Sequence, residues 1–506
     1  MSVQYGKVIS LILLERFGPV VEKVGAYLFK YGTTPLLYIK KSTNLPLSKV
    51  KESLCILIKY RLVTFQANRN ENLANYTLQH DRILLMLRYP KYINLIKKKF
   101  GNECEMIVEE ILQRSYWTAS EVIMKVIERL KKDHNKVVTI LSLREKFLTL
   151  LRAQYLGRLP YSQDDKPVPT LVITEIDHNT PPNIDPKQIS LVQSNKATVE
   201  SLPDNGIYWT INFDRFHQDM RDKLIVNAFT KRFDENGGEF VRLLLQQMYI
   251  RTTPWAEVSN PVPIVEIRDI VRKQATHQHL LAFFDQYVNV LEQDSTNLIR
   301  KAGDASGGSF QIYLKETFTQ FAWETVEQIV LEKFDSKAAR IFRLVKSKQY
   351  IEPDQIQQLA MIPAKEAKRI SYQLLEENFL QVQELKKSSS NGPNKCFTLF
   401  YVDLEQIVRM ILELCYKTLF NIMTRKNHER FVHKRIIDKK QRVDTIIMGM
   451  RAQGAAEEQL ADIEEMITPP EREILQKIEL TMKKLNSVEL EIDETIFLIQ
   501  MYLVYK

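Results

Sequence analysis

Basic side chains on predicted helices are the residues whose types and spacing point most directly to chemistry, namely contact with phosphate groups. The helix expected over residues 47–60 carries three lysines, is followed by an arginine and contains a single acidic residue, Glu52. In a helix-turn-helix the second helix enters the major groove of DNA, where basic side chains neutralise phosphates. Against the alternative of a solvated basic face, we predict nucleic-acid contact by Lys49, Lys51, Lys59 and Arg61.

A second basic segment, residues 86–100, interleaves its cations with Tyr89, Tyr92 and Phe100. Aromatic rings can stack on the bases of a single strand while cations follow its phosphates. The alternative is that the rings pack two domains together while the lysines face water. The predicted nucleic-acid contacts in this segment are Arg88, Lys91, Lys97 and Lys98.

The helix expected over residues 364–379 combines cations with acids. Ala367, Ile370 and Leu374 recur at helical spacing and predict a buried face, with the basic residues outward. Three glutamates on the same helix would repel a phosphate backbone, so a protein-protein contact is the alternative here. The predicted nucleic-acid contacts are Lys365, Lys368 and Arg369.

The densest basic cluster lies in residues 425–442, where only Glu429 and Asp438 are acidic. Apolar residues every three or four positions predict a coiled-coil-like helix, whose solvated face is one interpretation. An acidic partner or nucleic acid is the other. The predicted partner-binding residues are Arg430, Lys434, Arg435, Lys439 and Lys440.

Motifs for enzyme chemistry are missing from the sequence. Gly303 and Gly308 have the spacing of a phosphate-binding loop, but Ser309-Phe310 follow in place of the required Lys-Ser or Lys-Thr. The pairs His277/His279 and His428/His433 do not share a helix face, and no Cys-x-x-Cys pair occurs. We therefore expect no cofactor, no metal and no catalytic site.

Composition limits the class of protein further. With 506 residues the chain is too long to fold around a single hydrophobic core, so several domains are expected. Its content of 44% hydrophobic and 26% charged residues is ordinary for a globular protein. The formal charge of +9 suits an acidic partner or nucleic acid. No apolar run approaches the roughly 18 residues of a membrane helix, and charged residues interrupt the first predicted helix, so neither a membrane span nor a secretory signal is expected.

A repeated pattern of helices followed by two strands organises these segments. It occurs in residues 36–78, 264–314 and 351–401, and more weakly in 104–159, and it is the order of a winged helix. Residues 160–206 concentrate Pro, Asp, Asn and Ser, which is typical of a linker or extended segment. After Asp403 the helical periodicity predicts a long antiparallel hairpin.

Several longer strings resemble a known family from end to end. They are RFGPVVEKVG (16–25), MLRYPKY (86–92), DNGIYWTINFDRFHQDMRD (204–222), ARIFRLVKSKQYIE (339–352), AMIPAKEAKRISYQLLEENF (360–379), EEMITPPER (464–472) and DETIFLI (493–499). On these strings the chain closely resembles the winged-helix subunits of RNA polymerase III, the largest members of that enzyme's initiation heterotrimer.

The resemblance implies a mainly α fold with small β wings, built from four tandem extended winged-helix domains and a C-terminal antiparallel coiled-coil hairpin. It implies a relationship to the alpha subunit of transcription factor IIE. The boundaries we expect are 1–85, 86–160 and 207–320 for three winged helices, 161–206 for the linker, 321–403 for the last winged helix and 404–506 for the hairpin.

In function, the resemblance implies a non-catalytic nuclear subunit on the polymerase clamp. Its partners would be the large clamp subunit, a smaller winged-helix subunit, an acidic-tailed subunit, transcription factor IIIB and promoter DNA, single- or double-stranded, with no membrane. One departure is that residues 160–206 lack the dense Lys/Arg cluster of some relatives. This puts a DNA or regulatory role of that segment in doubt.

Two alternatives stay open on the sequence. A helical scaffold of a proteasome-lid or translation-initiation type would carry winged-helix character only near its C-terminal part, and the predicted hairpins near 63–78 and 299–314 count against it. A sequence-specific repressor would need a cleaner recognition helix than residues 364–379.

Overall fold

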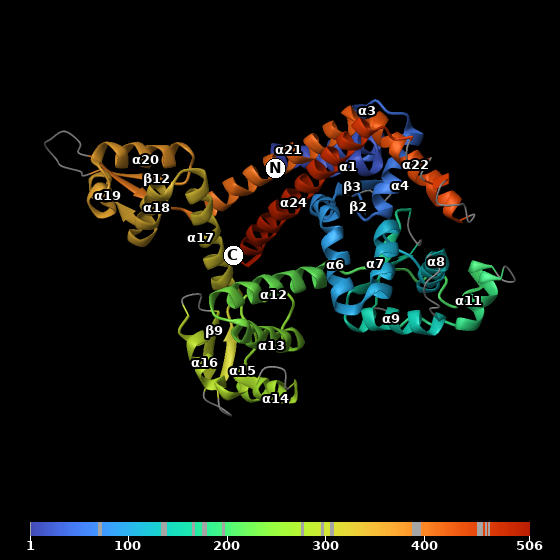
Figure 1. Cartoon of the computed structure of the whole chain (residues 1–506), viewed down its shortest axis with the longest axis horizontal. Coiled ribbons are helices and arrows are strands. Elements are labelled where there is room, and N and C mark those ends of the chain that lie inside the picture. Colours follow the sequence, from blue (N-terminus) through green and yellow to red (C-terminus); the bar gives the residue numbers. More distant parts are fainter. Residues whose placement is uncertain are drawn as a thin grey trace. The chain divides into compact units, whose positions relative to one another are not determined.

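The computed structural model describes residues 2–68, 73–132, 139–163, 167–174, 180–194, 198–274, 278–294, 298–303, 308–386, 396–452, 459–460, 463 and 466–505. The residues between Gly303 and Gly308 lie outside these ranges, as does part of the hairpin expected after Asp403. The chain divides into two compact units. Unit 1 comprises Met1–Asp219 with Lys417–Asp493, and unit 2 comprises Met220–Tyr416 with Glu494–Lys506 (Figure 1).

The first winged helix lies in unit 1 and follows α1 (Val3–Phe17). Its strands form an antiparallel sheet of order β1-β3-β2, so the short first strand pairs with the returning wing strand. The third helix of this module buries the side chains of Val50, Leu54 and Leu57 beneath this sheet. The elements are α2 (Pro19–Tyr31), β1 (Thr34–Pro35), α3 (Leu36–Thr43), α4 (Leu47–Lys59), β2 (Val63–Ala67) and β3 (Ala74–Leu78).

Two winged helices of the same topology lie in unit 2, with sheet orders β8-β10-β9 and β11-β13-β12. One consists of α13 (Glu235–Arg251), β8 (Val262–Pro263), α14 (Ile264–Gln274), α15 (Gln278–Ala282), α16 (Phe284–Glu292), β9 (Ile299–Gly303) and β10 (Ser309–Ile312). The other follows α17 (Leu314–Lys333) and consists of α18 (Ser336–Lys348), β11 (Tyr350–Ile351), α19 (Pro353–Ala360), α20 (Ala364–Glu376), β12 (Gln381–Lys386) and β13 (Cys396–Tyr401).

The remaining winged helix, in unit 1, has a long insertion in its wing. Its sheet joins β4 (Leu156–Arg158) to β7 (Trp209–Ile211), and a bridge from Trp117 to Trp209 supplies the third member. The helices are α7 (Asn102–Arg114), α8 (Ala119–Lys132) and α9 (Ile140–Arg152). Between the wing strands lie β5 (Tyr161–Gln163), β6 (Thr170–Val172), α11 (Pro186–Gln193) and the 3-10 turn η2 (Val199–Ser201).

This pairing corrects two expected boundaries. Residues 161–206 were expected as a linker, and residue 207 as the start of a third winged helix. The hydrogen bonds of β7 instead close the sheet of the second winged helix, so the polar segment is an insertion within one module. The sequence does not reveal this because strand pairing across some fifty residues depends on register and burial, not on local pattern.

The same backbone turn ends the third helix in three of these modules. Arg61 after α4, Gln154 after α9 and Asn378 after α20 have φ values of 58°, 62° and 61°. In the first, the amide of Leu62 donates to the carbonyl oxygen of Leu57 at 2.8 Å, and the corresponding bond recurs in the other two. This is the Schellman arrangement, whose left-handed residue satisfies the last helical carbonyls.

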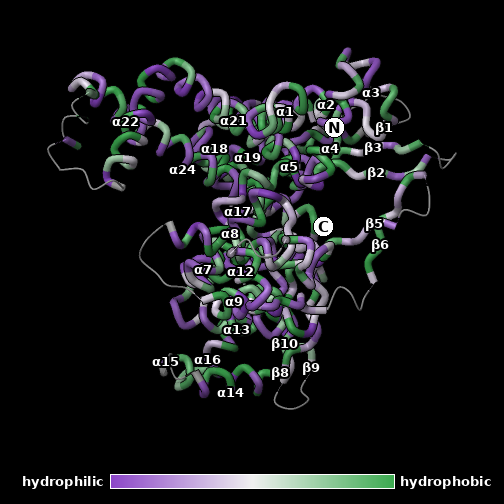
Figure 2. The backbone as a smooth tube through the Cα atoms, turned by 90° about the vertical axis from the view of Figure 1, so that its right-hand side faces the viewer, coloured by the Kyte–Doolittle hydropathy of each residue, from purple (hydrophilic) through white to green (hydrophobic). Residues whose placement is uncertain are grey.

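Further helices connect and extend the modules. They are α5 (His80–Leu85), the 3-10 turn η1 (Met86–Arg88), α6 (Tyr89–Phe100), α12 (Phe213–Arg232), α21 (Leu404–Val432), α22 (Lys434–Ala452) and α24 (Pro469–Tyr505). The unit boundaries fall within α12, α21 and α24. Hydrophobic and hydrophilic residues alternate along most helices, as expected for amphipathic helices (Figure 2).

The C-terminal helices form the predicted antiparallel hairpin. Lys426 of α21 pairs with Glu489 of α24, whereas Lys439 of α22 pairs with Glu471. The residue number along α21 and α22 rises from 426 to 439 while that of the paired residue in α24 falls from 489 to 471, so α24 runs antiparallel to the other two helices. The fold class is therefore confirmed: a mainly helical chain with small β wings, winged helices and a terminal hairpin. Among the described residues, no helix is both long and apolar enough to cross a membrane.

Candidate nucleic-acid and partner interfaces

Three of the predicted nucleic-acid contacts lie on the outer surface of α4. Lys49, Lys51 and Lys59 are exposed because the opposite side of the helix is buried in the module. Within the described part of the chain, none of the three takes part in an ion pair. These lysines, which we call the α4 face, therefore keep their charge available to an external anion.

Arg61 does not belong to the α4 face. It follows the helix in a left-handed conformation and is half-buried. Burial and the nearby positive charge of Arg82 lower the pKa of Arg61 to about 10. Arg61 lines a small cavity together with Arg82, a residue that no pattern in the sequence singled out.

Arg88 and Lys91 are used inside the protein. The Nε of Arg88 donates to Oδ1 of Asp493 at 2.7 Å, and both side chains are 2% exposed. The Nζ of Lys91 donates to Oδ2 of Asp493 at 3.0 Å and to the carbonyl oxygen of Leu490 at 2.7 Å. Arg88 is thus unavailable to nucleic acid and Lys91 nearly so, which corrects the prediction for this pair. A buried cation is retained only with such a partner.

The aromatic residues of the same segment also pack internally, as the alternative interpretation proposed. The ring of Tyr89 stacks on Phe213 with centroids 6.2 Å apart, and Tyr92 lies 4.9 Å from Phe216. The hydroxyl of Tyr92 is 2.9 Å from Nε2 of His217. Burial and the charge of Arg88 lower the pKa of His217 to about 3, so this imidazole is neutral at physiological pH.

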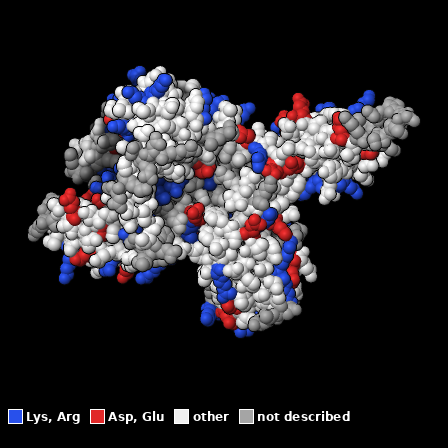
Figure 3. Space-filling model, turned by 180° about the vertical axis from the view of Figure 1, so that it is seen from behind, with Lys and Arg blue, Asp and Glu red and all other residues white. Residues whose placement is uncertain are grey.

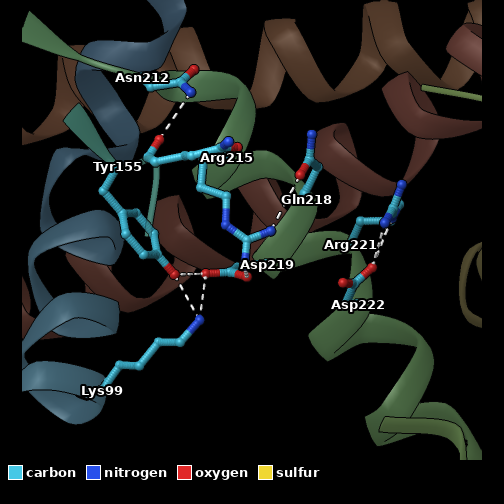
Figure 4. A network of polar contacts seen from close by, with 9 residues as sticks. Lys99, Tyr155, Asn212, Arg215, Gln218, Asp219, Arg221 and Asp222 are labelled. Atoms are coloured by element: carbon cyan, nitrogen blue, oxygen red, sulfur yellow. Dashed lines mark hydrogen bonds and ion pairs between the residues drawn. The ribbon is translucent and has the colours of Figure 1, made fainter. Parts of the chain in front are cut away.

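The end of α6 is more open. Lys97 and Lys98 are exposed, and Lys97 pairs with Glu105 at 3.0 Å. Their neighbour Lys99 donates to the hydroxyl of Tyr155 at 2.7 Å and pairs with Asp219 at 3.2 Å (Figure 4). Lys98 makes no ion pair with the residues that the structure describes, so its charge stays available to an external anion.

The carboxylate of Asp219 contacts three polar groups of unit 1, two of them distant in sequence and one on its own helix. It accepts from Lys99 and from the hydroxyl of Tyr155, and it pairs with Arg215 at 3.2 Å (Figure 4). Arg215 also donates to Gln218 at 3.2 Å. Arg215, Gln218 and Asp219 belong to the string 204–222, and the network ties the start of α12 to Lys99 of α6 and to Tyr155, which follows α9.

The basic residues of α20 occupy the expected outward face. Lys365, Lys368 and Arg369 are exposed, and the predicted burial of Ala367, Ile370 and Leu374 is confirmed. We call the three cations the α20 face. They make no ion pair among the described residues, whereas Glu366 pairs with Lys337 at 2.6 Å and Glu377 with Lys333 at 2.7 Å.

These glutamate pairs weaken the objection to nucleic-acid contact at α20. A carboxylate with a lysine at hydrogen-bonding distance repels a phosphate less than an isolated one. Since the lysines come from α17 and α18, the sequence of α20 alone could not show this compensation. Figure 3 shows Lys and Arg interspersed with Asp and Glu over much of the face it draws.

The predicted partner-binding residues divide into paired and free groups. Arg430 pairs with Glu15 at 3.0 Å, and Lys439 with Glu471 at 2.6 Å. Lys434 and Arg435 are exposed at the start of α22 and make no ion pair in the described ranges. Lys440, half-buried, lies close enough to Glu479 to help lower the pKa of that carboxyl, after the larger effect of Lys483.

Exposed apolar residues accompany the hairpin cations, and no pattern in the sequence singled them out. Phe431 and Val432 are 79% and 56% exposed at the junction of α21 and α22. With Lys434, Arg435 and Asp438 they line an open groove. Helical spacing alone does not tell a buried apolar residue from an exposed one, and these two lie where α21 ends at Val432, just before α22 begins at Lys434.

Tandem winged helices, a wing insertion and a long helical hairpin define this chain as a multi-module winged-helix protein. Family models match along its length: an RNA polymerase III subunit RPC82 helix-turn-helix domain at residues 7–68, an RNA polymerase III subunit RPC82 domain at 174–320, the POLR3C C-terminal winged-helix domain at 326–402, and the helical hairpin domain of DNA-directed RNA polymerase III subunit RPC3 at 435–498.

Curated relatives match over nearly the whole chain. DNA-directed RNA polymerase III subunit RPC3 of Bos taurus and that of Homo sapiens are each 37% identical to it over 98% of both chains. The subunit of the same name from Danio rerio is 34% identical over 99% of both chains. The chain belongs to the RPC3 family of RNA polymerase III subunits.

Family membership confirms the resemblance and decides between the open alternatives. A proteasome-lid or translation-initiation scaffold would not match an RNA polymerase III subunit over 98% of its length. As a polymerase III subunit, the chain has other subunits of that enzyme as partners, and a nuclear location is implied. Within the described residues, no group of three or more His, Cys, Asp or Glu side chains is arranged to hold a metal ion.

Proposed function

We propose that the chain is a non-catalytic subunit of RNA polymerase III that acts by docking. In this proposal it lies on the clamp within a heterotrimer that contains a smaller winged-helix subunit and an acidic-tailed subunit. It supports initiation through contact with transcription factor IIIB and helps to open promoter DNA. Family membership supports the polymerase assignment, and the charged faces support the role of DNA.

The observation that carries DNA contact is the shared position of two free basic faces. The α4 face and the α20 face lie on the third helix of their modules, the element that a helix-turn-helix presents to the major groove. Their cations are exposed and make no ion pair in the described part of the chain. Phosphate contacts of this kind are weak alone and gain strength when the rest of the polymerase holds the DNA nearby.

Promoter opening by assembled polymerase tests this proposal. One variant combines Lys49→Gln, Lys51→Gln and Lys59→Gln, and another combines Lys365→Gln, Lys368→Gln and Arg369→Gln. Permanganate reactivity of unpaired thymines then measures open promoter at several salt concentrations. We expect reduced opening for at least one variant, with the deficit relative to wild type largest at low salt, because each lost cation removes a phosphate contact together with the salt dependence of that contact.

A charge-matched control is available among exposed lysines outside both faces. Lys348→Gln, Lys477→Gln and Lys484→Gln together remove the same number of charges. Equal opening by all variants and wild type at every salt concentration would contradict DNA contact through these faces. Loss of opening in the control as well would assign the effect to net charge instead.

A further inference from the structure

A small cavity in unit 1 brings two half-buried arginines together. It has a volume of about 20 Å³ and lies where the first winged helix meets α6, α7 and the start of α12. Arg61, Arg82, Tyr89 and Phe213 contribute to its lining. That volume accommodates one oxygen-sized group, because a buried water needs roughly 10–15 Å³ by the same measure.

Among the described residues, no carboxylate is hydrogen-bonded to either arginine. Within the described residues, the guanidinium of Arg61 makes no ion pair, and the hydrogen bond of Arg82 goes from Nη1 to the backbone oxygen of Arg61 at 3.4 Å. Asp214, which is exposed, attracts Arg82 without a hydrogen bond in the structure. Burial and mutual repulsion lower the pKa of Arg61, which is the electrostatic condition of a site built for an anion.

The backbone at Arg61 gives independent support. The equivalent left-handed positions in two other modules hold Gln154 and Asn378. A left-handed conformation costs an L-residue roughly 1–2 kcal/mol, and Asn is one of the residues that reduce this cost. The turn itself can be made by an uncharged residue, as at Gln154 and Asn378, so the half-buried guanidinium of Arg61 is not needed to close the helix.

The amino end of α12 adds a third favourable group. Phe213, the first residue of this 20-residue helix, lines the cavity, as do Thr210 and Ile211 just before it. The amino end of a helix carries partial positive charge and free N–H groups, so an anion at this edge is stabilised. The α4 face ends beside the same cavity, because Lys59 precedes Arg61 by two residues.

We propose that Arg61 and Arg82, with the amino end of α12, form a seat for one backbone phosphate of a nucleic-acid strand that runs along the α4 face. One non-bridging oxygen enters the cavity while the rest of the phosphate stays outside. The choice of nucleic acid rests on the proposed function; the anion seat itself rests on the cavity and its two arginines.

Inorganic phosphate tests the seat in the full chain. We expect the melting temperature to rise with phosphate relative to chloride at equal ionic strength, because an anion that binds only the folded state stabilises it. Arg61→Gln and Arg82→Gln should each abolish this rise. The first variant is expected to fold because glutamine already occupies the equivalent turn at position 154. A phosphate response that persists in both variants overturns the seat.

A DNA titration tests the assignment of the ligand. Arg61→Gln should weaken binding of the full chain to a short DNA about three- to tenfold and reduce the slope of log affinity against log salt by about one. Lys348→Gln removes the same charge from an exposed site in unit 2 and should leave both quantities unchanged. Wild-type affinity and slope in Arg61→Gln overturn the nucleic-acid assignment.

The two proposals fail separately. If the wild-type chain shows the phosphate response but no DNA binding at low salt, the nucleic-acid assignment and the DNA part of the proposed function are overturned together, and the anion seat stands. The opposite outcome is that DNA binding depends on the α4 face, while Arg61→Gln and Arg82→Gln change neither the phosphate-induced rise in melting temperature nor the DNA affinity. In that case the seat is overturned and the proposed function stands.

Discussion

At the scale of single residues, Arg88 and Asp493 show why a basic residue in an aromatic segment can serve packing. They are 405 positions apart in sequence, yet Nε and Oδ1 are 2.7 Å apart and both side chains are nearly inaccessible. Two strings that carry the family resemblance, 86–92 and 493–499, contribute one partner each. The shared strings therefore reflect, at this point, the joining of η1 to α24 and not contact with DNA.

Removing one partner of this ion pair should destabilise unit 1 strongly. We expect Arg88→Met to lower the free energy of unfolding by about 3–5 kcal/mol, because Asp493 is left buried with only Lys91 as a cation. The double variant Arg88→Met with Asp493→Leu should recover most of the loss. Urea denaturation followed by circular dichroism measures both, and a single variant within 1 kcal/mol of wild type would contradict the assigned role.

His217 makes the stability of unit 1 depend on pH. Its pKa falls from 6.5 to about 3 on folding, owing to burial and the charge of Arg88. The folded state thus binds fewer protons, so the contribution is complete above pH 6.5 and is lost as the pH falls toward 3. Between pH 7.5 and 5 the loss should be about 2 kcal/mol.

The matched comparison for this pH effect is His217→Asn, which cannot take up a proton. Its free energy of unfolding should fall less than that of wild type over the same range, measured by urea denaturation at each pH. Parallel curves for the two proteins would show that His217 does not control the acid sensitivity.

At the scale of elements, the third helix and its end turn are the repeated unit. The left-handed residues Arg61, Gln154 and Asn378 close α4, α9 and α20 in the same way. The helices differ in what their outer faces carry, because each module buries an equivalent apolar side and leaves the rest free to vary. Wing closure differs too, since one module accommodates an insertion between β4 and β7.

The end turn predicts a stabilising substitution at Gln154, which has φ of 62° and an exposed side chain. Glycine adopts this conformation without a steric cost, so Gln154→Gly should raise the free energy of unfolding by about 0.5–1 kcal/mol. Gln154→Ala keeps a Cβ and should not stabilise the protein. The denaturation midpoints of the two variants measure this difference in stability. Equal stabilisation by alanine and by glycine would exclude the steric cost of the left-handed conformation as the cause.

At the scale of the whole molecule, the chain is a series of modules that leaves several charged surfaces free for other macromolecules. The hairpin offers Lys434 and Arg435 beside the exposed side chains of Phe431 and Val432. Such a mixture of cations and apolar residues suits an acidic, partly apolar partner segment. The paired residues act within the protein instead: Arg430 joins the hairpin to α1, and Lys439 joins α22 to α24 within the hairpin.

Charge reversal at the free hairpin cations should therefore weaken assembly. We expect Lys434→Glu with Arg435→Glu to reduce the recovery of other RNA polymerase III subunits with the tagged chain from nuclei. Lys477→Glu with Lys484→Glu makes the same charge change on the exposed surface of α24 and should recover them normally. Quantitative mass spectrometry of the purified material measures both, and equal recovery would remove Lys434 and Arg435 from the partner interface.

The sequence by itself determined the helical periodicity, the winged-helix order, the hairpin and the family, because these depend on local pattern and on strings that survive in relatives. It also placed Lys49, Lys365 and their neighbours on outer faces. Only the tertiary structure decided which cations remain free. Arg88 forms a buried ion pair with Asp493 and is unavailable to nucleic acid, and Glu366 is paired with Lys337. The strand that begins at Trp209 pairs with the strand that begins at Leu156. The reason is that burial and ion pairing depend on distance in the folded structure, and the residues that meet there are often far apart in the sequence.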